Sequence, residues 1–516
     1  MKDIDLAGRI GRLYTRQGYI ETPYIFPVVD PILKNQYISL NDILSMGFNA
    51  IITNAYILKK HINTVVDIHK HLNFNGIIMT DSGAYQILRY GDIEVSNREI
   101  VLYQCEIKSD IGVILDIPTS YNVDRETALR SADETYRRAV EALDIVESCR
   151  GTLWTLPIQG GTHLDVLRQY AMKSVDVFYR GYSLYALGSP TTLLEQYEFD
   201  KIIDMIFTVR SVIPFSAPLH LFGAGHPLII PFAIALGIDT MDSASYILYA
   251  KDNRYITSRG TYRLEDLRYL PCTCPICSKY SLEELQKASK DERTKLLALH
   301  NLYIILKEFK EVKQAIKECR LWEYLESKAN SHPATRRAFE QVKRYVEFIY
   351  RHTPIVKPNA KAVFIISKDS IYNPKVMIPR RRIVERFSIE GECLNLIPYI
   401  YNGRKIPSIF NENESSKCIN YVYIPILGIA PLKLVDHYPY SQFEFGLEID
   451  GDVIDDLSYI ILEKLLIERK MSKLAKVNIY ICQDIEWHRK LYNRLANLTK
   501  SFKEINIEVV LKTIKC

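Results

Sequence analysis

Three aspartates, Asp81, Asp116 and Asp242, each stand just after a short apolar run of the sequence. Two carboxylates that face one site can cleave a glycosidic bond, because one attacks the anomeric carbon while the other transfers the proton of the leaving group. Each aspartate taken alone could instead cap the helix that follows it. Another apolar run is followed by Gln159 and two glycines, and this repetition favours one shared site over three unrelated helix caps.

A second group of residues has the spacing of a metal site. Cys272, Cys274 and Cys277 lie within six residues, and His300 follows them in a helical pattern. Thiolates and an imidazole are ligands of tetrahedral zinc, and four protein ligands leave no position open for water, so the predicted Zn2+ is structural. The alternative is a set of buried thiols beside a core histidine. His220, in contrast, is predicted to be a packing residue.

The elements that must position these residues recur along the chain. Short β-branched runs alternate with amphipathic helical stretches from about residue 48 to 245, and a polar residue or glycine follows each run. Continuous apolar runs are typical of parallel strands buried on both faces. We therefore expect an α/β fold, a (β/α)8 TIM barrel whose site lies at the carboxyl ends of the strands. A doubly wound open sheet is the alternative. The expected strands are residues 50–53, 76–79, 112–115, 153–156, 184–187, 219–222 and 238–241.

The expected domains follow from changes in composition and in the predicted secondary structure along the sequence. A catalytic barrel domain covers residues 1–350 and contains an inserted zinc-binding lobe at about 260–305, with two helices near 281–326 and 333–350. Residues 351–427, which are basic and strand-rich, and residues 428–516, a small α+β unit, follow as C-terminal domains.

Length and charge narrow the possible classes of protein but do not identify the function. The chain has 516 residues, 47% of them hydrophobic, and a net charge of +5, which suits several domains and is compatible with binding nucleic acid. No apolar stretch approaches the ~20 residues of a membrane span, and the first residues have neither a signal-peptide nor a transit-peptide pattern. We expect a cytoplasmic protein with no membrane partner.

Five motifs in order resemble one family. They are Asp81-Ser82-Gly83-Ala84-Tyr85-Gln86, Leu115-Asp116-Ile117-Pro118-Thr119, Pro157-Ile158-Gln159-Gly160-Gly161, residues 237–245 around Asp242, and the Cys272/Cys274/Cys277/His300 set. They resemble the tRNA-guanine transglycosylases, and residues 5–11 and 242–250 are similar to the archaeal branch in particular. The resemblance implies exchange of guanine at position 15 of the tRNA D-arm for 7-cyano-7-deazaguanine, the first step of archaeosine formation.

The resemblance also implies a role for each motif residue. Asp242 would attack ribose C1′ and form a covalent intermediate, and Asp81 would act as general acid and then general base. The base would be bound by a further set of residues: Asp116, Gln159, Gly188, Ser189, Tyr85 and Ser82. A base in folded tRNA must first be unstacked before it can enter such a pocket. The partners are then tRNA, guanine and the deazaguanine, and family members are commonly homodimers.

Two features depart from the family pattern. Pro190 follows Gly188 and Ser189 in the base-recognition loop, and proline has no backbone N–H with which to hold the incoming base. Nothing near the end of the chain resembles the PUA domain that archaeal members usually carry, so we expect either a separate PUA-domain protein or a contribution of Arg380–Arg382 to RNA binding. Phosphate contacts are expected from a basic stretch, Lys251, Arg254, Arg259, Arg263 and Arg268.

Three other functions remain compatible with parts of this pattern. A non-catalytic transglycosylase-like subunit would bind tRNA but should lack the aspartates, and so should an archaeosine-synthase-like paralogue. An unrelated zinc-bearing barrel hydrolase would act on small glycosides. The presence of both Asp81 and Asp242 argues against the first two.

Overall fold

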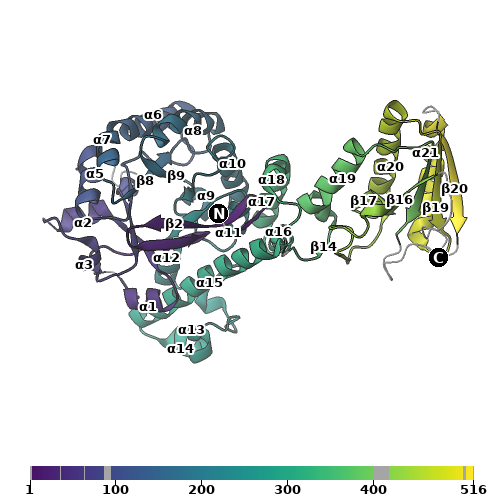
Figure 1. Cartoon of the computed structure of the whole chain (residues 1–516). Helices are drawn as coiled ribbons and strands as arrows, with labels where there is room; N and C mark the ends of the chain where they lie inside the picture. The colour runs from purple at the N-terminus through teal and green to yellow at the C-terminus, as the bar shows by residue number, and fades with distance from the viewer. Residues whose placement is uncertain are drawn as a thin grey trace. The chain divides into compact units, whose positions relative to one another are not determined.

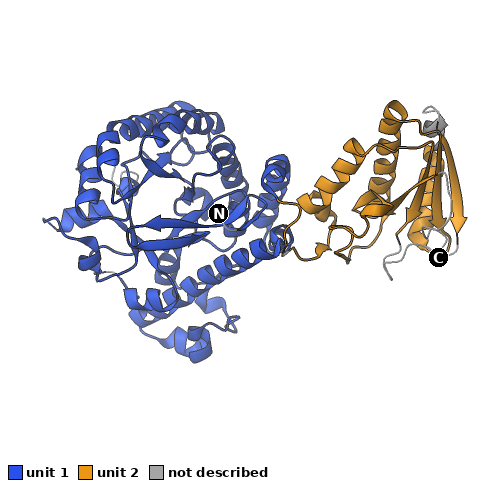
Figure 2. Cartoon of the chain, viewed as in Figure 1, with its two compact units in different colours: residues 1–353 blue, residues 354–516 orange. Residues whose placement is uncertain are grey.

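The computed structural model describes residues 3–34, 36–62, 64–86, 94–358, 360–399, 418–503 and 507–514. The chain divides into two compact units, residues 1–353 and residues 354–516 (Figure 2). None of the described helices combines the length and apolar character needed to cross a membrane.

The first unit contains the predicted barrel. Eight parallel strands form one sheet in the order β4-β11-β10-β9-β8-β7-β6-β5. The ring closes between β4 and β5, where Val28 bridges Ile52 and the Val29 N–H donates to the Ile52 carbonyl at 2.8 Å. The (β/α)8 fold class is therefore confirmed. The strands are β4 (Tyr24–Pro27), β5 (Ala50–Asn54), β6 (Ile77–Asp81), β7 (Ile111–Val113), β8 (Leu153–Ile158), β9 (Tyr182–Leu187), β10 (Leu219–Leu221) and β11 (Thr240–Ser243).

The first strand of the barrel lies before the region in which the sequence predicted strands. β4 is only four residues long and ends in a proline, so it offers little of the periodicity that marks a strand. It pairs in register with β11, with Asp242 opposite Phe26.

The amino end of the barrel is closed by an apolar plug. A three-stranded antiparallel sheet, β1 (Asp3–Asp5), β2 (Gly8–Thr15) and β3 (Gly18–Thr22), precedes the barrel. Ile20 of this sheet shares one buried cluster with Phe26, Ile52, Met79 and Val113 of the barrel strands. Polar side chains consequently gather at the other end, where the strands finish.

Helices connect the strands and surround them (Figure 1). They are α1 (Leu40–Ser45), α2 (Ala55–His61), α3 (Ile68–Leu72), α5 (Asn97–Glu106), α6 (Arg125–Glu141), α7 (Leu143–Ser148), α8 (Leu164–Phe178), α9 (Thr191–Glu195), α10 (Phe199–Arg210), α11 (Ile230–Ala235) and α12 (Ser245–Lys251). Cys105 and Cys149 form a disulfide between α5 and the end of α7, a pairing that the sequence analysis did not predict.

The lobe after α12 is more divided than the sequence suggested. It begins with the hairpin β12 (Arg254–Thr257) and β13 (Gly260–Arg263). Residues 281–326, expected as one helix, contain three, and residues 333–350 contain two. One break follows from Cys319, whose left-handed φ of +59° ends α15. The helices are α13 (Pro275–Lys279), α14 (Leu282–Lys287), α15 (Lys290–Glu318), α16 (Leu321–Ala329), α17 (Pro333–Arg344) and α18 (Val346–His352).

The second unit is built around one sheet. Its five strands lie in the order β17-β16-β15-β19-β20, so segments on both sides of residue 427, expected as separate domains, share a sheet. Cys393 and Cys418 form a disulfide beside it. The elements are β14 (Val363–Ile365), α19 (Pro374–Arg386), β15 (Cys393–Pro398), β16 (Ile419–Ile424), β17 (Gly428–Pro431), β18 (Phe443–Phe445), α20 (Gly451–Met471), β19 (Lys476–Cys482), α21 (Glu486–Lys503) and β20 (Glu508–Ile514).

The structure corrects the expectation for the arginine run. Arg380 lies in α19 and is 7% exposed. Its guanidinium donates to the Ile426 carbonyl at 2.5 Å and to Asp456 at 2.8 Å. A buried, paired guanidinium cannot also bind a phosphate, so Arg380 is a structural residue and only Arg381 and Arg382 remain exposed.

Candidate active site and metal centre

The polar residues singled out in the sequence lie at the carboxyl ends of the barrel strands. Asp81 is the last residue of β6, Gln159 directly follows β8, and Gly188 directly follows β9. Asp242 lies in β11, and Asp116 stands three residues beyond the end of β7. Because parallel strands finish at one edge, these side chains are brought to one end of the barrel.

Asp81 is held in an environment that favours its protonated form. Its pKa is raised from 3.8 to about 7, first because burial disfavours the charge and then because the negative charges of Asp116 and Asp242 lie close. The Asn54 side chain donates to Asp81 Oδ2 at 3.2 Å. A carboxyl group whose pKa lies near neutrality can both give and take a proton.

The Asn54 side chain makes two hydrogen bonds, one to the backbone and one to Asp81. Its side-chain oxygen accepts the Ile57 N–H at 2.9 Å and caps α2, which leaves the amide nitrogen directed at Asp81. The cap fixes the orientation of the amide, so the same contact that starts α2 also positions the donor to Asp81.

Asp116 belongs to a buried polar network. Gln159 Nε2 donates to Asp116 Oδ2, and Gln159 Oε1 accepts from Ser189 Oγ at 2.8 Å and from the Thr119 N–H at 3.3 Å. Burial raises the pKa of Asp116 to about 6, while the hydrogen bond from Gln159 lowers it. Carboxylate, amide and hydroxyl groups fixed in this way can bind the polar edge of a planar base.

Gly188 leaves room for Gln159 in this network. A Cβ at position 188 would lie 2.1 Å from Gln159 Nε2, so the Gln159 amide would have to leave its place in the network. Ser189 follows with a left-handed φ of +69°. This backbone brings the Ser189 hydroxyl to the Thr119 N–H at 2.9 Å.

Asp242 is held on one of its two oxygens. The Gly223 N–H donates to Oδ1 at 2.8 Å, and His220 Nε2 contacts the same Oδ1 at 3.1 Å. Asp242 is 8% exposed. Across the parts of the chain that the structure describes, every hydrogen bond found for this carboxylate ends on Oδ1, so Oδ2 is the oxygen left for a reaction.

The remaining predicted residues differ in exposure. Tyr85 is 53% exposed, and its ring can therefore stack on an incoming base. Ser82 is buried, and its hydroxyl has no hydrogen-bond partner among the described residues.

The cysteine and histidine ligands come together as predicted. Single donor atoms of Cys272, Cys274, Cys277 and His300 all lie within 4.8 Å of one another. His300 Nδ1 is 3.4 Å from the sulfurs of Cys274 and Cys277, while its Nε2 lies 2.9 Å from the Ile256 carbonyl. The carbonyl contact holds the proton on Nε2 and leaves the Nδ1 lone pair facing the thiols. This cluster could hold a metal ion with four protein ligands.

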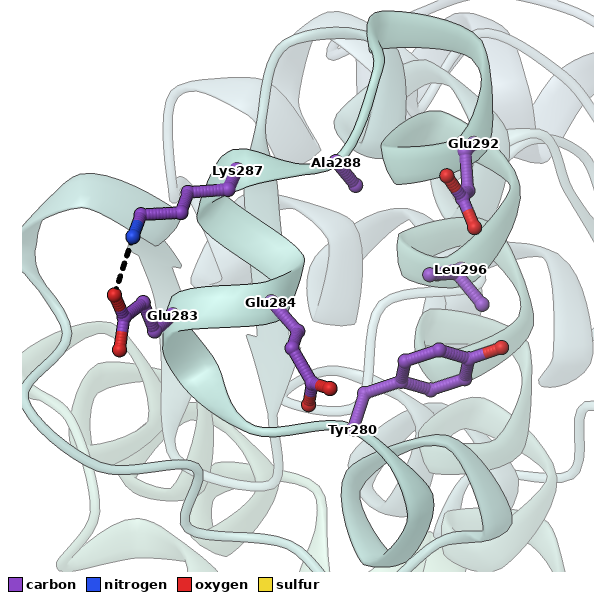
Figure 3. A pocket seen from close by; sticks show the side chains of 7 residues that line it. All are labelled: Tyr280, Glu283, Glu284, Lys287, Ala288, Glu292 and Leu296. Carbon is purple, nitrogen blue, oxygen red and sulfur yellow. Dashed lines mark hydrogen bonds and ion pairs between the residues drawn. The ribbon is translucent and has the colours of Figure 1, made fainter.

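A pocket of about 460 Å³ also lies in the lobe, between α14 and α15 (Figure 3). Glu283 and Lys287 form an ion pair at its rim, and the Glu284 carboxylate accepts from the Ser281 N–H at the start of α14. None of the predicted catalytic, base-binding or metal-binding residues lines this pocket.

Two neighbours of the aspartates, Asn54 and His220, were not predicted from the sequence to contact them. Asn54 is one of the polar residues that follow an apolar run, and His220 is predicted to be a packing residue. Nothing in the local pattern distinguishes such residues, because their contacts with Asp81 and Asp242 cross 27 and 22 residues of sequence. Asn54 is the last residue of β5, and this position at a strand end is a signal in the sequence, whereas His220 lies in the middle of β10 and carries none.

Comparison with known proteins agrees with this geometry. The sequence model of the family described as queuine tRNA-ribosyltransferase (TGT) matches residues 5–334. The tRNA-guanine(15) transglycosylase of Saccharolobus solfataricus is 45% identical over 496 residues, 94% of this chain and 97% of that protein. Those of Aeropyrum pernix and Thermococcus kodakarensis are each 40% identical, covering 96% and 71% of their own lengths. The chain therefore belongs to the queuine tRNA-ribosyltransferase family, the tRNA-guanine transglycosylases, which are enzymes.

Proposed function

We propose that this enzyme exchanges the guanine at position 15 of tRNA for 7-cyano-7-deazaguanine, through a covalent link between ribose and Asp242. The observation that carries the proposal is the proximity of the Asp81 and Asp242 carboxylates. They lie close enough for the charge of Asp242 to raise the pKa of Asp81. The names of the relatives, tRNA-guanine(15) transglycosylase, support the position in tRNA.

The exchange needs two displacements at C1′ of the ribose. In the first, a lone pair of Asp242 Oδ2 forms a bond to C1′, the bond from C1′ to N9 breaks, and Asp81 gives its proton to the departing guanine. In the second, Asp81 takes the N9 proton of the incoming base, which bonds to C1′ while the electron pair of the C1′–Oδ2 bond returns to Asp242. One glycosidic bond replaces another, so no energy source is required.

The base is bound by the network around Gln159. Asp116 and the Gln159 amide would read the polar edge of the purine, with the Gly188-Ser189 segment beside them and Ser82 behind Asp81. Tyr85 would stack on the exposed face, as aromatic side chains do with flipped bases. Pro190 has no N–H to offer, so position 190 gives no backbone hydrogen bond to the incoming base.

The four-ligand cluster suits a structural Zn2+. Cys272, Cys274, Cys277 and His300 would hold it, and all four coordination positions would then be filled by protein. The ion would tie α13 and the adjoining loop to α15 and thereby stabilise the fold of the lobe.

The tRNA backbone is expected to lie against the same lobe. Lys251, Arg259 and Arg268 are exposed, whereas Arg254 pairs with Asp252 at 2.6 Å. Positive groups near a substrate site attract phosphates. A homodimer and a separate PUA-domain protein remain further proposals.

Covalent trapping tests the nucleophile. We expect wild-type enzyme mixed with tRNA to form an adduct that survives denaturing electrophoresis, and Asp242→Asn and Asp242→Ala to form none while still binding tRNA. Asp144→Asn, a change at an exposed carboxylate, should behave like wild type. Undiminished exchange of labelled guanine by either Asp242 variant would contradict the assignment, and tRNA binding by wild type without any exchange would favour a non-catalytic subunit.

Nucleoside analysis tests the incoming base. Mass spectrometry of tRNA digests after incubation with 7-cyano-7-deazaguanine or 7-aminomethyl-7-deazaguanine should show incorporation of the cyano compound. Preferred incorporation of the aminomethyl compound would overturn the proposed substrate while leaving the reaction class intact.

A further inference from the structure

His220 lies in β10 beside the proposed nucleophile and is fully buried. Its Nε2 is 3.1 Å from Asp242 Oδ1, and its Nδ1 is 2.9 Å from the hydroxyl of Thr240. Both ring nitrogens therefore have partners on the neighbouring strand β11. The ring is flanked by Phe222 and Phe26, with centroids 4.7 and 6.1 Å away.

These contacts define where the proton of the imidazole lies. An ionised carboxylate can only accept hydrogen bonds, so Nε2 must be the donor to Asp242. In the neutral ring Nδ1 is then an acceptor, and the Thr240 hydroxyl donates to it. Thr240 thus selects the form of His220 that donates to Asp242.

The two donors on Asp242 act on a single oxygen. His220 Nε2 and the Gly223 N–H both bind Oδ1, which orients the carboxylate plane and leaves Oδ2 for ribose C1′. When Oδ2 becomes an ester oxygen, Oδ1 becomes an uncharged carbonyl oxygen. A hydrogen bond to a charged acceptor is about twice as strong as one to a neutral acceptor, so these donors favour the free carboxylate over the ester.

We propose that His220 is a positioning residue that sets the balance between free Asp242 and the ribosyl ester. This inference rests on the proposed function. By stabilising the carboxylate that leaves in the second displacement, His220 keeps the intermediate reactive toward the incoming base and limits the fraction of enzyme held as the adduct. Packing alone would not need the contacts to Asp242 and Thr240, because a phenylalanine would fill the space between Phe222 and Phe26 equally well.

The test is the ratio of covalent to free enzyme at equilibrium with tRNA and guanine. His220→Phe keeps an aromatic ring and removes the donor, and we expect the ratio to rise by roughly fivefold to tenfold, since a charge-assisted hydrogen bond exceeds a neutral one by about 1 to 1.5 kcal/mol. Release of the adduct by excess guanine should slow in parallel. His220→Gln, whose amide can donate in place of Nε2, should restore most of the wild-type ratio.

Controls separate this effect from a loss of structure. His226 is also buried and contacts Thr261, not Asp242, so His226→Gln should leave the ratio unchanged. If His220→Phe does not fold, Thr240→Val tests the same contacts from the other end and should raise the ratio by about twofold to threefold, a fraction of one hydrogen bond.

The possible outcomes distinguish the two proposals. If wild type forms no adduct, the proposed nucleophile is wrong. If wild type forms the adduct and both His220→Phe and Thr240→Val give an equal or lower ratio, Asp242 stands but the positioning role of His220 is overturned.

Discussion

Replacing Asp81 by asparagine should inactivate the enzyme and yet stabilise it at alkaline pH. The pKa of Asp81 is raised to about 7 from an ordinary value of 3.8, chiefly by burial. A carboxyl group with a raised pKa contributes stability that is fully present below pH 3.8 and is lost as the pH rises through about 7. An uncharged asparagine removes this pH-dependent cost.

The magnitude follows from the two pKa values. A difference of about 3 in pKa corresponds to about 4 kcal/mol in the free energy of unfolding above pH 7. Part of this cost is already present at pH 5, so the advantage of the variant should grow by about 2.5 kcal/mol between about pH 5 and about pH 8. The Asp81 carboxylate has two acceptor oxygens for three donors, the Asn54 amide and the N–H groups of Ser82 and Gly83. An asparagine has only one acceptor oxygen, and the lost hydrogen bonding lowers the free energy of unfolding by about 1 to 2 kcal/mol at every pH.

Chemical denaturation of the full chain at several pH values measures this difference for the barrel unit. Asp124→Asn is the matched control, because Asp124 caps α6 and its pKa is lowered by the Thr127 N–H, so no gain with rising pH is expected there. A stability difference between wild type and Asp81→Asn that is the same at both ends of the pH range would refute the argument.

Three further predictions concern activity and the lobe. Because the first displacement needs the proton on Asp81, the rate of adduct formation should fall about tenfold per pH unit above about 7 in rapid-quench measurements, and a flat profile would exclude this acid. Gly188→Ala should displace Gln159 and lower kcat/KM for the base by about 100-fold, a loss of about 3 kcal/mol, whereas Gly451→Ala, where a Cβ meets no atom within 4 Å, should not. Removing the metal from the cysteine and histidine cluster with a chelator should lower the melting temperature of the barrel unit and release one equivalent of zinc by mass spectrometry; an unchanged melting temperature would contradict a structural ion.

The barrel could be predicted because its strand ends are marked in the sequence. Asp81, Gln159 and Gly188 each follow an apolar run, and a run followed by a polar residue is a local pattern. β4 could not be found in this way, since its four residues form a barrel strand only through pairing with β11 and β5. The cysteine spacing likewise predicted the Cys272/Cys274/Cys277/His300 cluster, because the short loop brings the three cysteines together locally.

Contacts between distant residues were beyond local reasoning. Arg380 stands in a basic run that looks exposed, but its partner Asp456 lies 76 residues away. His220 has the sequence context of a core residue, and only the pairing of β10 with β11 brings it beside Asp242. For the same reason the sequence predicted two domains, residues 351–427 and 428–516, where the structure has one sheet. β15 and β19 are far apart in the chain but adjacent in space.

The first barrel strand along the chain, β4, lies between β11 and β5, and its pairing with both affects when the enzyme can act. β11 carries Asp242 and pairs with β4, and β4 in turn bridges to β5. The barrel that brings Asp81 and Asp242 to one end is therefore closed only once β4 has paired with both neighbours. During synthesis, a chain that has not yet exposed residues 240–243 contains Asp81 but has no partner for it. We expect catalytic competence to appear only after residues 240–243 have emerged and β11 has paired with β4, so that shorter chains cannot cleave the bond between ribose and base in tRNA.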